Sequence, residues 1–350
     1  MRPDDALSIA REDLPEWLAL LGTRAQMIAP TSGPHGDVFY SPVSSPDEIL
    51  WEFENSLQPP KRFLLPQTDP LVKIHSDGGR FHLEPVCDDR RQILVNLRSC
   101  DLKGLLYLER VHTYDLPDPS YLRRSENRSL VSLACTEPCP PGFCICCDAG
   151  PFLRHGFDLQ MTMLSDRMFV EVGSDKGRSL LEGAESMFRP ATPDEIAKRE
   201  ALEAAARDHF KTETCHFGSA MRRISTGRVA EELWEAMGDW CLECGGCTLI
   251  CPTCYCFSVK DRRVDEGWVR CRTWDSCQYA AFTLEASGHN PRPGRKDRMK
   301  RRFFHKVSAQ YYQRDGDVGC VGCGRCIKVC MGTTNMPAVV EAIRKGEWHG

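Results

Sequence analysis

Two cysteine runs with the same spacing constrain this chain more than any other feature. Each run follows the pattern C-x2-C-x2-C-x3-C, and together they comprise Cys241, Cys244, Cys247 and Cys251, then Cys320, Cys323, Cys326 and Cys330. Three thiolates at two-residue steps can wrap one face of an iron–sulfur cube, and small residues such as Gly245 and Gly324 permit the tight turn that this requires. The fourth cysteine of each run then points away from its own cube.

The paired runs predict two 4Fe–4S clusters with crossed ligands. In two-cluster ferredoxins, the fourth cysteine of one run ligates the other cluster. We therefore expect one cluster on Cys241, Cys244, Cys247 and Cys330, and the other on Cys320, Cys323, Cys326 and Cys251. Zinc is the alternative, because closely spaced cysteines also form zinc ribbons and structural adaptors. A zinc ribbon uses separated C-x2-C pairs, however, so the triple step that occurs twice favours iron–sulfur clusters.

The ends of the chain and its composition indicate a compartment. The N-terminal stretch is acidic and lacks an apolar run, and no later segment offers eighteen uninterrupted apolar residues, so neither a secretory signal nor a membrane span is predicted. We expect a cytoplasmic protein, in which twenty cysteines serve metal or redox chemistry instead of disulfides. The net charge of -4 shows no basic excess, so a nucleic-acid partner is not expected.

The length of 350 residues favours two domains. Twelve of the cysteines lie between Cys241 and Cys330, which suggests a boundary near residue 215. The expected fold class is α+β, with a mixed α/β domain over residues 1–215 and a helical, two-cluster ferredoxin-like domain over residues 216–350.

Several short segments of the N-terminal half have clear secondary-structure signals. Apolar or β-branched runs predict strands over residues 92–97, 129–134 and 167–172. Residues 101–111 lie between the first two and space their leucines as a helix does, which favours some parallel strand pairing. Thr192 and Pro193 begin a predicted helix over residues 192–211 that connects the domains, and a shorter helix is expected over 226–240.

The remaining cysteines leave alternatives open. Cys100 and Cys135 follow predicted strands, and sites form where parallel strands end. A third cluster is therefore possible on Cys100, Cys135, Cys144 and Cys146, with Cys139 or Cys147 as substitutes; the alternative is a set of buried thiols that act as small hydrophobic groups. A further group consists of Cys254, Cys256 and Cys277. These cysteines either shield the neighbouring clusters or ligate a further cluster.

A basic run over residues 292–302 is the strongest charge feature. It is interpreted as a solvated face, as a docking surface for an acidic partner, or as a positive field that favours reduced clusters. There is no P-loop, no G-x-G-x-x-G fingerprint and no recognisable acid/base pair, so no catalytic residue is proposed.

Longer segments carry a family resemblance. They read "LRSCDLKGLLYLERV" (97–111), "CPTCYCFSVKD" (251–261), "RTWDSCQYAAF" (272–282), "GHNPRPGRKDRMKRRFFHK" (288–306) and "CVGCGRC" (320–326). Together they resemble the iron–sulfur electron-transfer subunits typified by the sulfhydrogenase beta subunit of cytoplasmic NiFe hydrogenases and by the corresponding iron–sulfur subunit of anaerobic sulfite reductase. The loop "CICCDAGP" departs from the family, whose members commonly carry "CFC" and a longer glycine-rich turn.

The resemblance implies a role in electron transfer. Such a subunit relays electrons between a flavin subunit that meets NAD(P)H and a catalytic hydrogenase or sulfite/sulfur reductase subunit, and it performs no substrate chemistry itself. The alternative is a reductase whose N-terminal domain binds flavin or substrate and is supplied with electrons by its own ferredoxin-like domain.

Overall fold

The larger sheet forms the centre of the N-terminal half. The structure is a computed structural model that describes residues 6–209, 215–265 and 267–350. In this described part, the sheet has eight strands, of which β2, β6, β7 and β8 pair in parallel and the others antiparallel. In sheet order they are β10 (Phe188–Pro190), β1 (Ala6–Ala10), β9 (Arg167–Val172), β8 (Leu159–Met163), β7 (Arg128–Leu133), β6 (Gln92–Arg98), β2 (Gln26–Ser32) and β3 (Val38–Val43).

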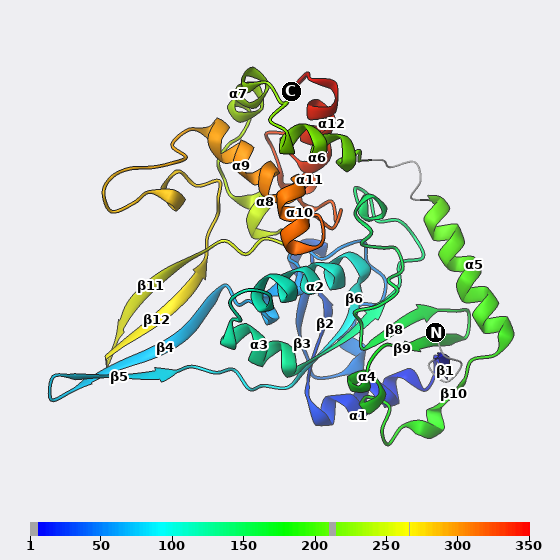
Figure 1. Ribbon diagram of the computed structural model, residues 1–350. Coiled ribbons are helices and arrows are strands. Elements are labelled where there is room, and N and C mark those ends of the chain that lie inside the picture. Colours follow the sequence, from blue (N-terminus) through cyan, green and yellow to red (C-terminus); the bar gives the residue numbers. More distant parts are fainter. Residues whose placement is uncertain (1–5, 210–214, 266) are drawn as a thin grey trace.

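Helices cover both faces of this sheet (Figure 1). Strand β6 is apolar on both faces, as is typical of a central parallel strand. Its residues Ile93 and Val95 pack in one core with α1 (Leu14–Arg24), whereas Leu94 and Leu97 pack in another core with α2 (Ser99–Thr113). The shorter helices beside them are α3 (Pro119–Glu126) and α4 (Asp175–Ser179).

The predicted elements of this half are confirmed. Strands β6, β7 and β9 and helix α2 lie where the sequence places them. Helix α5 (Pro193–His209) begins with a capping box in which Thr192 and Glu195 exchange hydrogen bonds, while its predicted last residues, 210 and 211, lie outside the described residues. The helix predicted over 226–240 is shorter, because Gly227 has a left-handed φ of 67° that separates α6 (Phe217–Ser225) from α7 (Glu231–Asp239).

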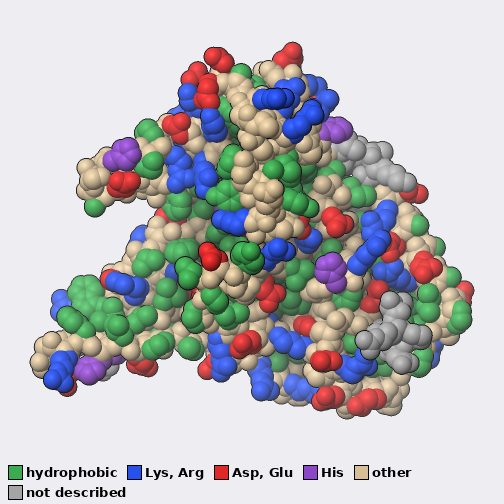
Figure 2. All heavy atoms as spheres, viewed as in Figure 1, with side chains coloured by type: hydrophobic (Ala, Val, Ile, Leu, Met, Phe, Trp, Pro, Cys, Tyr) green, Lys and Arg blue, Asp and Glu red, His purple; other side chains and the backbone are tan. Residues whose placement is uncertain are grey.

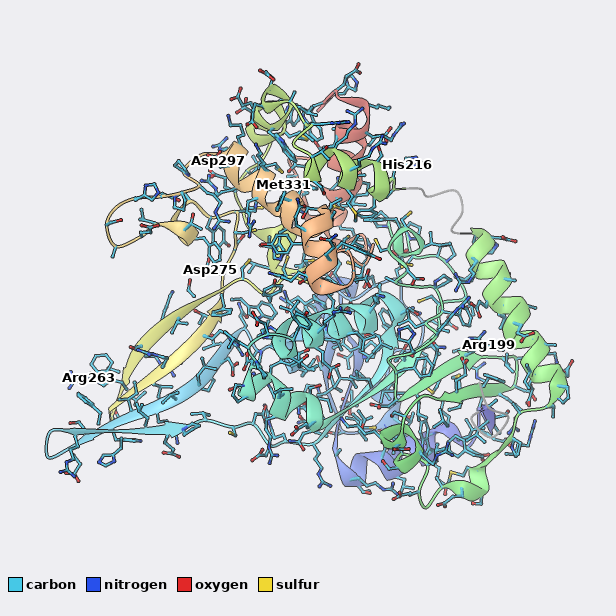
Figure 3. All side chains as sticks on the ribbon, in the orientation of Figure 1. Arg199, His216, Arg263, Asp275, Asp297 and Met331 are labelled. Carbon is cyan, nitrogen blue, oxygen red and sulfur yellow. The ribbon has the colours of Figure 1, made fainter. Side chains whose placement is uncertain are left out.

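A second sheet projects from the body as an arm, and the sequence did not predict it. In the described residues it has four strands in the antiparallel order β11 (Phe257–Val264), β12 (Gly267–Trp274), β4 (Thr68–Asp77) and β5 (Arg80–Pro85). Figure 1 shows it extending to the left of the body, and Figure 2 shows hydrophobic side chains along it. Asp275 lies at its root and Arg263 farther out (Figure 3). The boundary at residue 215 stays a prediction, and this sheet joins strands from both sides of it.

The C-terminal helices enclose a separate core. Trp234 of α7, Phe303 of α9 (Arg295–Val307) and Ile343 of α12 (Met336–Lys345) meet there. Phe143, from the N-terminal half, packs into the same core. No helix among the described residues is long and apolar enough to cross a membrane. The remaining short helices are α8 (Gly246–Leu249), α10 (Ala309–Asp315) and α11 (Arg325–Val329).

Candidate metal centres

The two cysteine runs fold in the same way. In each, a glycine in the left-handed conformation precedes a short helix that carries the third cysteine: Gly245, with φ 71°, precedes α8, and Gly324, with φ 74°, precedes α11. A Cβ at Gly245 would lie 2.6 Å from the Tyr279 ring, and one at Gly324 would lie 2.8 Å from the backbone of Pro141. Both turns therefore require glycine, for the backbone conformation and for the close approach.

Helices α8 and α11 lie side by side, which brings the two runs together. A Cβ at Gly246 would be 3.0 Å from Val329. Between the runs lie two small cavities, each with a volume of about 20 Å³. We call them the outer cavity and the inner cavity.

The outer cavity is lined by four thiols together with Gln278 and Glu243. Cys244 is exposed, and the neighbouring side chains Leu242 and Met331 are 57% and 81% exposed. Met331 is labelled in Figure 3. The cavity is therefore close to solvent. Its thiols are Cys241, Cys244, Cys247 and Cys330.

The inner cavity is lined by thiols of the second run, by Cys251 and by three basic side chains. Its basic residues Arg302, Lys306 and Arg325 are all buried. Cys247 also lines it, so the two cavities are adjacent. The fourth cysteine of each run thus lies at the cavity of the other run. Besides Cys247, the thiols that line the inner cavity are Cys251, Cys320, Cys323 and Cys326.

The chemistry of these thiols fits an iron–sulfur cluster. Burial raises the pKa of Cys247 to about 11 and of Cys323 and Cys326 to about 12, so they would remain neutral thiols without a positive centre. A coordinated metal deprotonates such thiols. The thiols surround open space: in the described parts of the chain, no group of three or more His, Cys, Asp and Glu side chains is close enough to hold a single metal ion.

The side chains of the basic run lie on two faces of helix α9, one outward and one inward. On its outward face, Lys296 and Lys300 pair with Glu235 and Glu231 of α7. On its inward face, Arg298 and Arg302 are each only 3% exposed. The interpretation of the whole run as a docking surface is therefore wrong for these two arginines, because a helix places residues four apart on one face and the inward face is packed against the cavities.

Side chains of the α/β half also reach the inner cavity. The guanidinium of Arg325 pairs with Asp101 of α2 at 2.6 and 2.9 Å and donates to Ser56 Oγ at 2.7 Å. Lys61, which is 2% exposed, donates from Nζ to the carbonyl oxygens of Cys251 and Cys254 at 2.8 and 2.9 Å. No sequence pattern indicates this role of Lys61. The inner cavity is therefore built by both halves of the chain.

The N-terminal cysteines divide into two groups. In the first, burial and then Cys135 raise the pKa of Cys139 to about 11, and burial followed by Cys135 and Cys139 raises the pKa of Cys144 well above its usual value. Cys100 is buried nearby, and Cys139 is among the groups that raise its pKa after burial and Asp101. Both Cys100 and Cys144 also lie near Cys323 of the inner cavity.

The second group contains Cys146, a member of the predicted third-cluster set whose ligation stays a prediction. Its Sγ accepts a hydrogen bond from the backbone N of Cys215 at 3.0 Å. Cys147 interacts with Cys320 of the inner cavity. The reason is local: Cys144–Cys147 form a 3-10 turn, in which successive side chains rotate by about a third of a turn, so Cys144 and Cys146 face different neighbours. Cys139, named as a substitute, is the neighbour of Cys144 instead.

The cysteines at the root of the arm form two pairs. The thiol of Cys254 hydrogen-bonds Cys251 and, ahead of Lys306, holds the pKa of Cys251 well below its usual value. Cys277 hydrogen-bonds Cys256, and this contact lowers the pKa of Cys277 to about 6. Cys254 therefore lies directly behind an inner-cavity thiol, as expected of a shielding residue, and its ligation of a further cluster stays a prediction.

Comparison with known proteins agrees with this geometry. Residues 240–334 match the family described as a 4Fe-4S dicluster domain. This matched segment contains all eight thiols of the two cavities. The chain is also 31% identical, over 339 residues, to the sulfhydrogenase 2 subunit beta of Pyrococcus furiosus, and the match covers 96% of this chain and 97% of the relative. The chain thus belongs to the family of iron–sulfur electron-transfer subunits that includes the sulfhydrogenase beta subunits.

Proposed function

We propose that this chain relays electrons within a multi-subunit oxidoreductase, between a flavin subunit that reacts with NAD(P)H and a catalytic hydrogenase or sulfite/sulfur reductase subunit. The observation that carries the proposal is the pair of adjacent cavities, each lined by thiols from both cysteine runs and together by eight thiols. The relative is by its name one subunit of a sulfhydrogenase, which supports a role inside a complex.

The residues have distinct parts in this relay. Cys241, Cys244, Cys247 and Cys330 would hold one 4Fe–4S cluster, and Cys320, Cys323, Cys326 and Cys251 the other; each cluster supplies one-electron redox chemistry. Cys247 lines both cavities, so the chain holds the two centres next to each other. Phe143 and Pro252 line the inner cavity and limit the access of water.

The experiment is anaerobic purification of the full chain from its native source with whatever subunits accompany it. We expect co-purification with a flavoprotein and a hydrogenase or reductase subunit, and reduction of this chain's clusters by NAD(P)H only when the flavoprotein is present. Isolation of the chain alone, with clusters that NAD(P)H reduces directly, would contradict the proposal.

We also propose a third cluster in the N-terminal half, and the structure favours Cys139 over Cys146 as its fourth ligand. The set is then Cys100, Cys135, Cys139 and Cys144: Cys139 lies near each of the other three, and Cys100 and Cys144 lie near Cys323. From stoichiometry, the full chain would contain about twelve irons rather than about eight. Cys139→Ser should lose about four of them, whereas the matched control Cys146→Ser should keep all. Eight irons in the wild-type chain would return these residues to the status of buried thiols.

A second candidate function rests on a cavity of about 380 Å³ at the carboxyl ends of three parallel strands. Arg98 of β6, Leu133 of β7 and Met163 of β8 line it, with Trp51 and Cys135. Ligands bind at this edge in open α/β sheets, so the N-terminal half would be a flavin or substrate domain with its own electron supply. Flavin released by acid from the purified single chain supports this candidate, and its absence favours the relay.

A further inference from the structure

Helix α9 carries a stripe of three buried cations at four-residue spacing. Arg298 and Arg302 are 3% exposed and Lys306 is 6% exposed. Residues four apart lie on one face of a helix, one turn above the other. Arg302 and Lys306 line the inner cavity, and Arg298 pairs with Glu243, which lines the outer cavity. The stripe therefore runs along both candidate clusters.

Lys306 makes the closest contact of this stripe with a candidate ligand. Its Nζ lies 3.4 Å from Cys251 Sγ, 2.9 Å from Thr253 Oγ1 and 2.6 Å from Gly319 O. A lysine ammonium carries three N–H donors, and these match the three acceptors around Lys306 Nζ. Lys306 is therefore a charged N–H donor to a sulfur atom.

The other cations differ in how they are neutralised. Arg298 has Glu243 as its partner and Arg325 has Asp101. Arg302 donates to the carbonyl oxygen of Thr334 at 3.1 Å, and its buried Nε has no hydrogen-bond partner. Within the described residues, neither Arg302 nor Lys306 forms an ion pair with a carboxylate. Arg302 serves both cavities, because Thr334, to which it donates, lines the outer one, so Lys306 is the cation without a carboxylate partner that lines the inner cavity alone.

This asymmetry bears on reduction. Reducing a cluster adds one negative charge, and nearby cations and N–H donors to the ligand sulfurs stabilise that charge, most strongly where water is excluded. Burial itself acts in the opposite direction, because it disfavours added charge. Lys306 contacts Cys251 directly inside this buried region, where a cation acts on added negative charge at short range and with little screening by water.

We propose that Lys306 sets the reduction potential of the inner cluster above that of the outer cluster, so that an electron passing through the chain rests on the inner one. The inference rests on the proposed relay function. Transfer of one electron from the outer to the inner cluster oxidises the first by one and reduces the second by one, with no proton moved. A one-electron donor, a partner's redox centre or a chemical reductant such as dithionite, reloads the outer cluster.

The test is a potentiometric titration of the anaerobic full-length holoprotein, followed by electron paramagnetic resonance. Cys241→Ser and Cys320→Ser assign the signals to the outer and inner clusters. Lys306→Met should lower the inner potential and leave the outer potential unchanged, while Lys306→Arg, which keeps the charge, should stay close to wild type. The matched control is Lys300→Met, on the outward face of the same helix, which should shift neither potential.

An inner potential that stays the same in Lys306→Met, or an equal shift of both potentials, would overturn the inference. If Lys306→Met does not assemble the inner cluster, Lys306→Gln is titrated instead, because its amide can still donate to Thr253 and Gly319; the same outcomes then decide. A wild-type chain without two 4Fe–4S signals contradicts the proposed function itself, whereas two clusters that are insensitive to Lys306 contradict only this inference.

Discussion

The outer and inner cavities begin from the same cysteine spacing and have different surroundings. The outer cavity is built by residues of the C-terminal half alone and lies beside the exposed Cys244 and Met331. The inner cavity takes Phe143 from the other half, and its Arg325 is held by Asp101. The motif therefore determines which thiols come together, and distant segments determine the charge and the water around them.

The largest expected effect concerns the crossed ligands. Cys330→Ser should damage the outer cluster, as Cys241→Ser does, although the two residues are far apart in sequence, because Cys330 lines the outer cavity. About four irons per chain are lost in each variant, from the cluster stoichiometry. Iron analysis and electron paramagnetic resonance measure this. If Cys330→Ser instead removed the signal that Cys320→Ser removes, the crossed ligation would be wrong and Cys330 would ligate the cluster of its own run.

Metal removal should then distinguish the cavities by rate. Chelators act on accessible ligands, so an iron(II) chelator under anaerobic conditions is expected to remove the iron of the outer cluster first, past the exposed Cys244. Absorbance of the chelate gives the time course, and the Cys241→Ser variant, which lacks the outer cluster, serves as control and should show only the slow phase. Release in a single phase would indicate equal access to both.

The next effect sharpens the comparison through stability. Asp101→Asn leaves the buried Arg325 guanidinium without its carboxylate, and breaking such a pair costs about 3–5 kcal/mol. We expect loss of the inner cluster while the outer signal persists. The matched control is Lys328→Met, in the helix of Arg325. It removes only the exposed ion pair with Glu54, which is worth about 0–1 kcal/mol. Chemical denaturation followed by circular dichroism compares the two variants, and equal stability would contradict the role of Asp101.

The smallest effect compares the two equivalent glycines. Alanine at either position is strained by the left-handed backbone, at a cost of about 1–3 kcal/mol. At Gly324 the new Cβ also meets the backbone of Pro141, whereas at Gly245 it meets the Tyr279 ring, which can move. Gly324→Ala should therefore have the lower melting temperature. Gly288→Ala, where a Cβ meets nothing within 4 Å, reports the backbone cost alone. If Gly324→Ala lowered the melting temperature no more than Gly288→Ala does, contact with Pro141 would add nothing to the cost.

Local patterns were enough for much of the fold. The apolar or β-branched runs of β6, β7 and β9, the leucines of α2 and the cap at Thr192 all depend on neighbouring residues, and these elements were predicted. Spacing also predicted which cysteines line each cavity, although ligation itself stays a prediction. The arm was not predicted, because β4 and β12 pair across about two hundred residues and neither strand shows its partner.

The inward cations could have been found from the sequence. Arg298, Arg302 and Lys306 lie next to Met299, Phe303 and Val307, which repeat at the same four-residue spacing and are buried. This periodicity indicates a helix whose basic stripe borders its apolar stripe, whereas composition alone suggests a solvated run. The separation of Cys146 from Cys144 had no such signal, since it depends on the 3-10 turn at Cys144–Cys147, and which of these cysteines ligate a cluster stays a prediction.

The arm has a consequence for how the chain is made. Because β12 pairs with both β11 and β4, a ribosome that has released only the N-terminal half leaves the β4–β5 hairpin with an open edge until residues 257–274 emerge. Open strand edges invite pairing with other chains, so the nascent protein passes through an aggregation-prone stage. A fragment that starts near residue 215 has the converse defect, an unpaired β12 edge. Recombinant production is therefore expected to succeed with the whole chain and to fail with either half.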